Sequence, residues 1–262
     1  LLPNSLRAYF SARLGGVKRI YGYKWQMRRF LVTAGPTPLM ENGVFKPQPM
    51  AEYYGALGRY LGLQMPSRPK PRLYISAAVA ERGRRRLAGY GVDETERVIG
   101  LNPGASFGSS KCWPPGHFAR LAELIEEAFR CRILLFGGPG EEPIAAAIVA
   151  ASRARIVNTV PDRIDLAELK PLIRRCDLLV TNDTGPRHYA VAFDVPVVVL
   201  MGPTDPRYTA ANLEKTRVIR HETECAPCHK KVCPTDHRCM AGIRPERVMD
   251  EILSLVKETD LS

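Results

Sequence analysis

The chain has 262 residues, 45% hydrophobic and 25% charged, which is an ordinary globular composition and enough for one large domain or two modest ones. No apolar run approaches the roughly eighteen residues that a membrane-spanning helix needs. The net charge of +11 is uneven, because residues 1–90 hold sixteen Lys and Arg against three Asp and Glu, whereas residues 91–262 hold 22 against 24.

The basic first third predicts an anionic partner, and a solvated basic face is the alternative. Nucleic acid is disfavoured, because the chain shows no helix-turn-helix pattern, no zinc-finger spacing and no interleaving of basic and aromatic residues. We therefore expect a phosphorylated substrate or an acidic membrane surface.

Residues 1–92 predict only part of a domain. The patterns indicate an amphipathic helix from residue 6, a strand at 18–24, a Pro- and Gly-rich span at 35–49, a helix near 49–63, and a loop and strand at 64–75 before a helix at 76–90. Because this is too little for a complete sheet, we expect the remainder of an N-terminal domain that binds an acceptor.

Residues 93–262 predict a second, complete domain of the α/β class. Apolar strands are expected at 97–102, 132–138, 154–158, 177–182 and 195–202, with helices at 116–129, 141–152, 165–176 and 186–193 between them and a helix at the C-terminal end. Buried strands that alternate with amphipathic helices are typical of a doubly wound parallel sheet.

Three of the predicted strands end in polar, Gly-rich turns, and ligands of open parallel sheets bind at such ends. The first turn, in NPGASFGSSKCW, offers backbone amides, hydroxyls such as that of Ser106, and the ammonium of Lys111 to a diphosphate. The second, GGPGEE, places Glu141 where a carboxylate can accept ribose hydroxyls. The alternative is that Glu141 and Glu142 only complement the helix dipole. A plain strand–helix connection is the alternative for the first turn.

The third turn is TNDTGPRHYA, where Thr184 suits a helix N-cap and Gly185 leaves room for a ligand. The free amides there favour an anion. Asp183 beside them suggests a ligand that also carries hydroxyls, such as a sugar diphosphate. A structural capping pair of Asp183 and Thr184 is the alternative.

The motifs NPGAS…SKCWP, LLFGGPGE and TNDTGPRHYAVAFDVPVVVLMGPTDP resemble the glycosyltransferase family 9 heptosyltransferases, and the resemblance spans nearly the whole chain. It implies a GT-B architecture of two Rossmann-like domains, of which the N-terminal one is incomplete here. It also implies an inverting transfer of a heptosyl residue from ADP-L-glycero-D-manno-heptose to the heptose of a heptosyl-Kdo-lipid A acceptor, at the cytoplasmic, inner face of the inner membrane of a Gram-negative cell. No cofactor is implied.

Carried over by position, the resemblance assigns Ser106 and Lys111 to the diphosphate, Glu141 to the nucleoside, and Asp183, Thr184 and Gly185 to the heptosyl diphosphate. His188 either reaches the site or packs on its helix, and Arg187, where the family usually has Met or Leu, contacts phosphate or solvent. The family's general base, an Asp in an N-terminal Gly-Asp motif, has no counterpart in this sequence, so we expect a fragment with a complete donor half.

Two other functions stay open: another GT-B nucleotide-sugar transferase or an epimerase, and a non-catalytic module that binds a nucleotide sugar. Seven cysteines indicate a reducing compartment. Cys225, Cys228, Cys233 and Cys239 have a spacing that either ligates a metal or forms a thiol-rich structural loop. Cys112, Cys131 and Cys176 are expected in the core.

Overall fold

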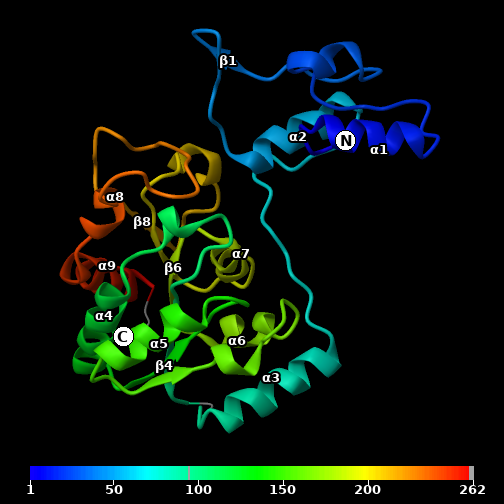
Figure 1. Cartoon of the computed structure of the whole chain (residues 1–262). Coiled ribbons are helices and arrows are strands. Elements are labelled where there is room, and N and C mark those ends of the chain that lie inside the picture. The colour runs from blue at the N-terminus through cyan, green and yellow to red at the C-terminus, as the bar shows by residue number, and fades with distance from the viewer. Residues whose placement is uncertain (94, 260–262) are drawn as a thin grey trace. The chain divides into compact units, whose positions relative to one another are not determined.

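The computed structural model describes residues 1–93 and 95–259, and these residues form two compact units (Figure 1). Unit 1 comprises Leu1–Pro69 together with Pro206–Ala211, and unit 2 comprises Lys70–Asp205 together with the chain from Asn212 onward. Each unit is described by itself.

Unit 2 contains a six-stranded parallel sheet in the order β5-β4-β3-β6-β7-β8. Its strands are β3 (Arg97–Asn102), β4 (Cys131–Leu135), β5 (Ile156–Asn158), β6 (Leu178–Asn182), β7 (Val197–Leu200) and β8 (Thr216–Ile219). The predicted doubly wound sheet is confirmed, and all five predicted strands are present. The edge strand β8 was not predicted.

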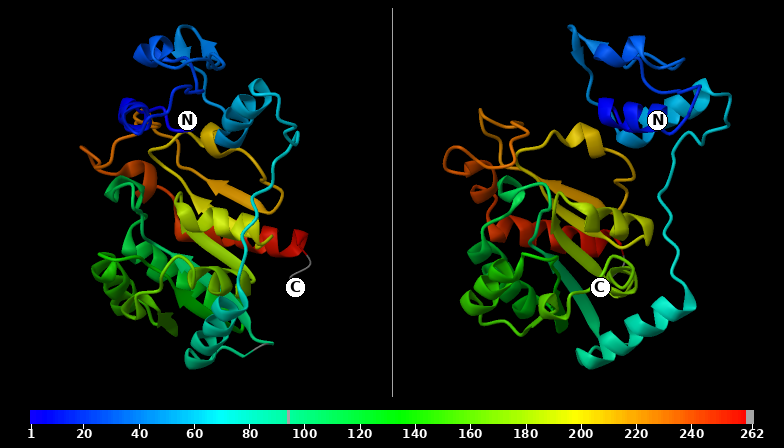
Figure 2. Two further views of the ribbon diagram at one scale, coloured as in Figure 1. Left: turned by 90° about the vertical axis from the view of Figure 1, so that its right-hand side faces the viewer. Right: turned by 45° about the vertical axis from the view of Figure 1, so that its right-hand side comes forward.

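Helices cover both faces of this sheet (Figure 2). They are α3 (Ala77–Gly89), α4 (Pro115–Ala128), α5 (Glu142–Ala151), α6 (Leu169–Arg175), α7 (Gly185–Ala192), α8 (Arg238–Ala241) and α9 (Pro245–Glu258). Short 3-10 turns lie at Ser109–Lys111 and Val160–Asp162.

Successive strand residues point to opposite faces, which explains the near-continuous apolar runs. On one face, side chains such as Leu101 and Val180 pack with α4, α5 and α9. On the other face, side chains such as Leu134 and Leu179 pack with α6 and α7. The two hydrophobic cores therefore hold the sheet rigid, and the carboxyl ends of its strands have fixed positions.

The helix α3 belongs to unit 2, although the sequence analysis set the domain boundary at residues 92 and 93. The compact units divide between Pro69 and Lys70 instead. Arg82 and Arg86 of α3 both bind the carboxylate of Glu168, and Gly83 lets α3 approach closely, since a Cβ there would lie 2.4 Å from Pro171 Cγ. These contacts attach α3 to α6.

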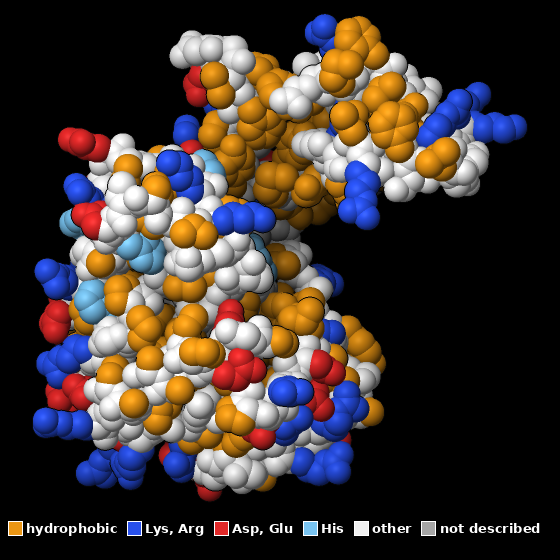
Figure 3. Space-filling view, in the orientation of Figure 1, with side chains coloured by type: hydrophobic (Ala, Val, Ile, Leu, Met, Phe, Trp, Pro, Cys, Tyr) orange, Lys and Arg blue, Asp and Glu red, His pale blue; other side chains and the backbone are white. Residues whose placement is uncertain are grey.

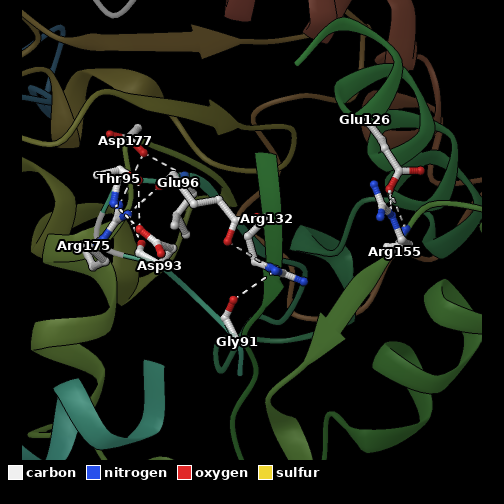
Figure 4. A network of polar contacts seen from close by, with 10 residues as sticks. Gly91, Asp93, Thr95, Glu96, Glu126, Arg132, Arg155, Arg175 and Asp177 are labelled. Carbon is white, nitrogen blue, oxygen red and sulfur yellow. Dashed lines mark hydrogen bonds and ion pairs between the residues drawn. The ribbon is translucent and has the colours of Figure 1, made fainter. Parts of the chain in front are cut away.

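The segment after α3 is tied to the sheet by a polar network at its amino edge (Figure 4). Arg132 contacts Glu96 at 3.2 Å and donates to the carbonyl of Gly91 at 2.9 Å. Arg175 donates to the carbonyl of Asp93, and Asp177 accepts from the amide of Val98 at 2.7 Å. The charges drawn there pair with one another, so this edge has a structural role.

Unit 1 contains α1 (Leu6–Leu14), a 3-10 turn at Gln26–Phe30, the short strands β1 (Met40–Glu41) and β2 (Val44–Phe45), α2 (Met50–Tyr60) and a 3-10 turn at Pro206–Thr209. The helices were predicted, but the strands expected at 18–24 and 64–75 were wrong. Tyr21 forms only one isolated bridge, with Ala34, because the described part of unit 1 offers no long strand to pair with.

The core of unit 1 is small and rich in tyrosine. The rings of Tyr23 and Tyr53 stack with centroids 3.7 Å apart, and Phe45 stacks on Tyr208 of the segment that joins unit 1 from later in the chain. Many large apolar side chains stay exposed, such as Leu14 and Phe30, and hydrophobic side chains gather on this unit in Figure 3. Apolar surface of this extent is typical of a face that packs against another surface. Among the described residues, no helix is both long and apolar enough to cross a membrane.

Asn182, at the end of β6, joins the loops at the carboxyl edge. Its buried amide donates to the carbonyls of Pro103 and Gly104 and accepts from the amide of Trp113. We expect Asn182→Ala to lower the free energy of unfolding by about 1–3 kcal/mol, because buried partners lose their hydrogen bonds. Urea unfolding measures this loss.

The matched control is Asn158→Ala, which removes an amide from the end of β5 whose oxygen accepts one hydrogen bond, from Val160. Asn158→Ala should lower the free energy of unfolding by less than Asn182→Ala does. Equal losses for the two variants would show that Asn182 does not join the loops.

Candidate functional site

The loops that follow β3, β4, β6 and β7 meet at the carboxyl edge of the sheet, because these strands are adjacent and parallel. All predicted donor-binding residues lie in these loops or at the start of the next helix. The structure therefore brings the three polar turns of the sequence analysis to one edge.

Asp183 lies at the centre of this edge and is only 8% exposed. Lys111 Nζ is 2.8 Å from its Oδ2 and also donates to its carbonyl at 3.0 Å. Arg187 Nη1 lies 3.0 Å from Oδ1, and the hydroxyl of Thr204 donates to Oδ2 at 2.9 Å. Both carboxylate oxygens are thus engaged, by groups from three different loops or helices.

The electrostatics of this cluster favour an ionised Asp183. Burial raises the pKa of its carboxyl, but the hydrogen bond and charge of Lys111, together with Arg187, outweigh burial and hold the pKa below its usual range. One carboxylate faces two cations, so the cluster has a net positive charge. Such a site attracts an anion.

Lys111 is held in place before any ligand arrives. Its side chain is 12% exposed, and its ammonium lies 5.0 Å from the centre of the Phe107 ring. Because the position of this ammonium is already fixed, little conformational entropy would be lost if it bound an anion.

Arg187 does not face solvent, which was one of the two contacts expected for it. It is 1% exposed, and its guanidinium pairs with Asp183 one helical turn away. An arginine at this depth requires an anionic partner, because an unpaired buried charge is costly. Its role is to hold the carboxylate.

The helix α7 begins at this cluster. Thr184 occupies the predicted N-cap position, but its side chain makes no capping hydrogen bond. Gly185 is exposed, and a Cβ there would meet nothing within 4 Å. The first turn of α7 therefore faces open space with its positive dipole end, as an anion site requires.

Glu141 connects the loops after β3 and β4. Its Oε2 accepts from the amide of Gly138 at 2.6 Å, and its carboxylate lies so close to Gly104 that a Cβ there would come within about 2 Å. Only glycine at position 104 therefore lets the carboxylate of Glu141 come this close to the backbone. The remaining lone pairs of Glu141 can accept hydroxyls.

The loop after β3 offers fewer free amides than the sequence analysis expected. The amides of Gly108 and Lys111 bond within the loop, and the amide of Ser110 donates to the carbonyl of Lys231 at 3.1 Å. Ser106 is exposed in this loop and His188 is exposed in the first turn of α7. Desolvation by the surrounding protein lowers the pKa of the His188 imidazole, and the nearby charge of Arg187 lowers it further. Ser106 and His188 make none of the hydrogen bonds described for Asp183, so their assignment stays a prediction.

Thr204 and Asn182 were missed by the sequence analysis. Thr204 lies in the GPTDP motif after β7, a motif to which only the family resemblance was attached. Asn182 precedes Asp183 and was assigned no function. Of the three cysteines expected in the core, Cys176 is buried, whereas Cys112 and Cys131 are half-buried.

The cysteine-rich segment at residues 225–239 lies against the same edge. The carbonyl of Pro203 accepts from the amides of Cys228 and His229, and His237 Nε2 lies 2.7 Å from the carbonyl of Ser110. Since a carbonyl only accepts, the imidazole donates there. Burial raises the pKa of the Cys239 thiol, and the three neighbouring thiols raise it further.

Relatives of this chain transfer heptose. Lipopolysaccharide heptosyltransferase 2 of Salmonella typhimurium is 30% identical over an alignment of 267 residues, which covers 98% of this chain and 75% of that protein. Lipooligosaccharide heptosyltransferase 2 of Campylobacter jejuni is 33% identical over 171 residues, which cover 63% of this chain. The chain spans about half the length of this Campylobacter relative, since 53% of it is covered.

A solved structure, that of E. coli ADP-heptose lps heptosyltransferase II, superposes on 98% of this chain with a TM-score of 0.76 and 25% identity, and 76% of that chain is covered. The architecture is thus that of the GT-B heptosyltransferases. The profile of glycosyltransferase family 9 (heptosyltransferase) matches residues 1–238. With its sheet, its strand-end cluster and these relatives, the chain belongs to glycosyltransferase family 9.

Proposed function

We propose that this chain belongs to an enzyme that moves a heptosyl residue from an ADP-heptose donor to the heptose of the lipopolysaccharide inner core, with inversion at the anomeric carbon. The observation that carries the proposal is the cluster of Lys111, Asp183 and Arg187 at the start of α7, in a chain of family 9. In this proposal unit 2 binds the donor, and residues 1–69 contribute to binding of the acceptor.

The donor diphosphate binds at the first turn of α7 and beside Lys111. Helix amides and an ammonium are suited to phosphate oxygens. Glu141 accepts the ribose hydroxyls, as its position over Gly104 at the end of β3 allows. Ser106, Thr184, Gly185 and His188 complete the proposed donor site from the same edge.

The reaction breaks the bond between the anomeric carbon and the diphosphate, so negative charge develops on the departing ADP. Lys111 and the dipole of α7 stabilise this charge, and fixed charges lower a barrier because they need no reorganisation. The acceptor hydroxyl must lose a proton as it attacks. We assign that general base to no described residue.

The acceptor is an anionic lipid, and we propose that the protein meets it at the cytoplasmic face of the inner membrane. Much of the basic run in α3 is paired internally, because Arg82 and Arg86 bind Glu168 while Arg84 and Arg85 approach Glu81. Residues 1–69 hold ten Lys and Arg against two Asp and Glu, so they supply the attraction.

Lys111→Ala should weaken binding of ADP-heptose roughly tenfold to a hundredfold, because a charge-assisted hydrogen bond contributes about 1.5–3 kcal/mol. Titration calorimetry measures the affinity. Lys257→Ala, at an exposed position of α9, is the control and should bind as the parent does. Unchanged affinity in Lys111→Ala would exclude Lys111 from the donor site.

Asp183→Asn should destabilise the chain by about 3 kcal/mol at neutral pH, because it leaves two cations without their buried carboxylate. The folded-state pKa of Asp183 is lowered, so its contribution to stability is present above the unfolded pKa of about 3.9 and is lost as the pH falls through the folded value. The difference in unfolding free energy between parent and variant, measured from pH 7 to pH 3, should therefore shrink toward acid.

This prediction separates two roles of Asp183. A difference that is independent of pH would mean that the carboxylate does not stabilise the cations. A variant as stable as its parent, but unable to bind donor, would mean that Asp183 contacts the sugar alone.

Lys18→Glu with Arg19→Glu should weaken binding to vesicles that contain anionic lipid. Each basic residue near such a surface contributes about 1 kcal/mol, so the pair should change binding by roughly thirtyfold, and salt should reduce the effect. Sedimentation with vesicles over a salt series measures it. The control, Arg130→Glu with Lys257→Glu, changes the charge of unit 2 by the same amount. An equal loss of vesicle binding in this control would contradict a membrane role for residues 1–69.

A further inference from the structure

Four cysteines converge on one cavity in unit 2, apart from the donor residues. Cys225, Cys228, Cys233 and Cys239 all line a cavity of about 110 Å³, which His237 also lines. The chain has seven cysteines, and the other three lie elsewhere, so this gathering is specific to one loop. Spacing alone did not establish that the four thiols share a cavity.

We propose that Cys225, Cys228, Cys233 and Cys239 bind one divalent metal ion of the thiolate-preferring kind, and that the ion fixes this loop against the donor site. Four sulfur ligands in tetrahedral arrangement are typical of Zn²⁺ and of iron. A volume of this size exceeds what a single ion needs.

Charges around the cavity suit such a site. Four thiolates and one divalent ion carry a net charge of −2. Lys230 lines the same cavity and supplies positive charge beside the sulfurs, whereas Arg238, which also lines it, pairs with Asp236 at 2.9 Å. Cations next to a cysteine favour its thiolate form, which is the form that binds metal.

The sulfurs have to approach one another for the ion to bind. Within the described residues, no three side chains of His, Cys, Asp or Glu are already grouped to hold a metal. Cys225 and Cys233 instead make weak contacts with Thr223 at 3.6 Å and Thr235 at 3.5 Å. A rotation about χ1 moves a cysteine sulfur between staggered positions, so binding of the ion would replace these two weak contacts.

His237 Nε2 does not bind the ion, since that atom already donates to the carbonyl of Ser110. This hydrogen bond attaches the cysteine-rich segment to the loop after β3. The backbone of the cysteine-rich segment also supports residues 108–111. The hydroxyl and amide of Ser110 donate to the carbonyls of Lys230 and Lys231, and a Cβ on Gly108 would lie 2.2 Å from the carbonyl of Lys231. An ion in the thiol cavity would therefore stiffen the loop that carries Lys111.

The first experiment is elemental analysis of the whole chain, purified under reducing conditions from medium with added zinc and iron. We expect one zinc or iron ion per chain, and the element found identifies the ion. Cys225→Ser and Cys228→Ser, at positions that are not buried, should each lose most of the metal while remaining folded by circular dichroism. Cys131→Ser, a half-buried cysteine of β4, is the control and should keep it.

The second experiment adds Co²⁺ to the metal-stripped, reduced chain. Intense thiolate-to-cobalt absorption that saturates at one equivalent, and is lost in Cys228→Ser, supports the site. Hydrogen exchange at the Ser110 amide should slow when the ion is bound, which a site unrelated to the donor loop would not produce.

The proposal would be overturned if the chain contained no metal above background and showed no cobalt absorption. It would also be overturned if Cys228→Ser and its parent contained the same amount of metal. A disulfide between these cysteines in the freshly isolated chain, seen as a mass loss of two hydrogens, would replace it by a redox role. Donor binding by the chain is measured separately, so failure of the metal site leaves the proposed transferase function standing.

Discussion

The buried carboxylate of Asp183 is the contact on which the candidate site depends. It lies between Lys111 and Arg187, and without it the two cations would repel each other at a buried position. Desolvating three charges is costly, and the cost is recovered only when each has its partner in good geometry. The cluster thus has one stable arrangement, and that arrangement places an ammonium beside the open first turn of α7.

The sheet makes this arrangement possible. Lys111 and Asp183 are far apart in sequence but belong to loops after the neighbouring strands β3 and β6. Asn182 then joins these two loops through hydrogen bonds to the carbonyls of Pro103 and Gly104, and Glu141 packs against Gly104 from the loop after β4. Polar side chains at strand ends therefore fix the loops, and the ligand does not have to order them.

Most of unit 2 could be predicted from the sequence, because its strands are buried on both faces and its helices are amphipathic. The strand β8 was missed because only two of its four residues are buried and because it borders a loop without periodicity. In residues 1–69, alternation at 18–24 suggested a strand, but pairing needs a neighbour, and residues 18–24 form only one bridge. The compact units divide at another place than the predicted domain boundary, because the contacts of α3 with Glu168 and Pro171 link distant segments.

The candidate site was predictable in its residue types but not in its pairings. Asp183, Lys111 and Glu141 were identified because charged residues follow apolar strands next to glycines. Arg187 pairs with the carboxylate of Asp183 because its side chain is buried. The sequence of an eight-residue helix does not show which of its side chains are buried. The cysteines are a second case, because their spacing does not show that all four line one cavity.

The loop after β3 has two neighbours that restrict it from opposite sides. Asp183 holds Lys111 at its end, while the cysteine-rich loop holds Ser110 and leaves no room for a side chain at Gly108. Three of its amides are used within the protein, so in the proposed function phosphate recognition falls to Lys111 and the first turn of α7. A loop restrained in this way binds by presenting a fixed charge, and whatever stiffens the cysteine-rich loop acts directly on the position of that charge.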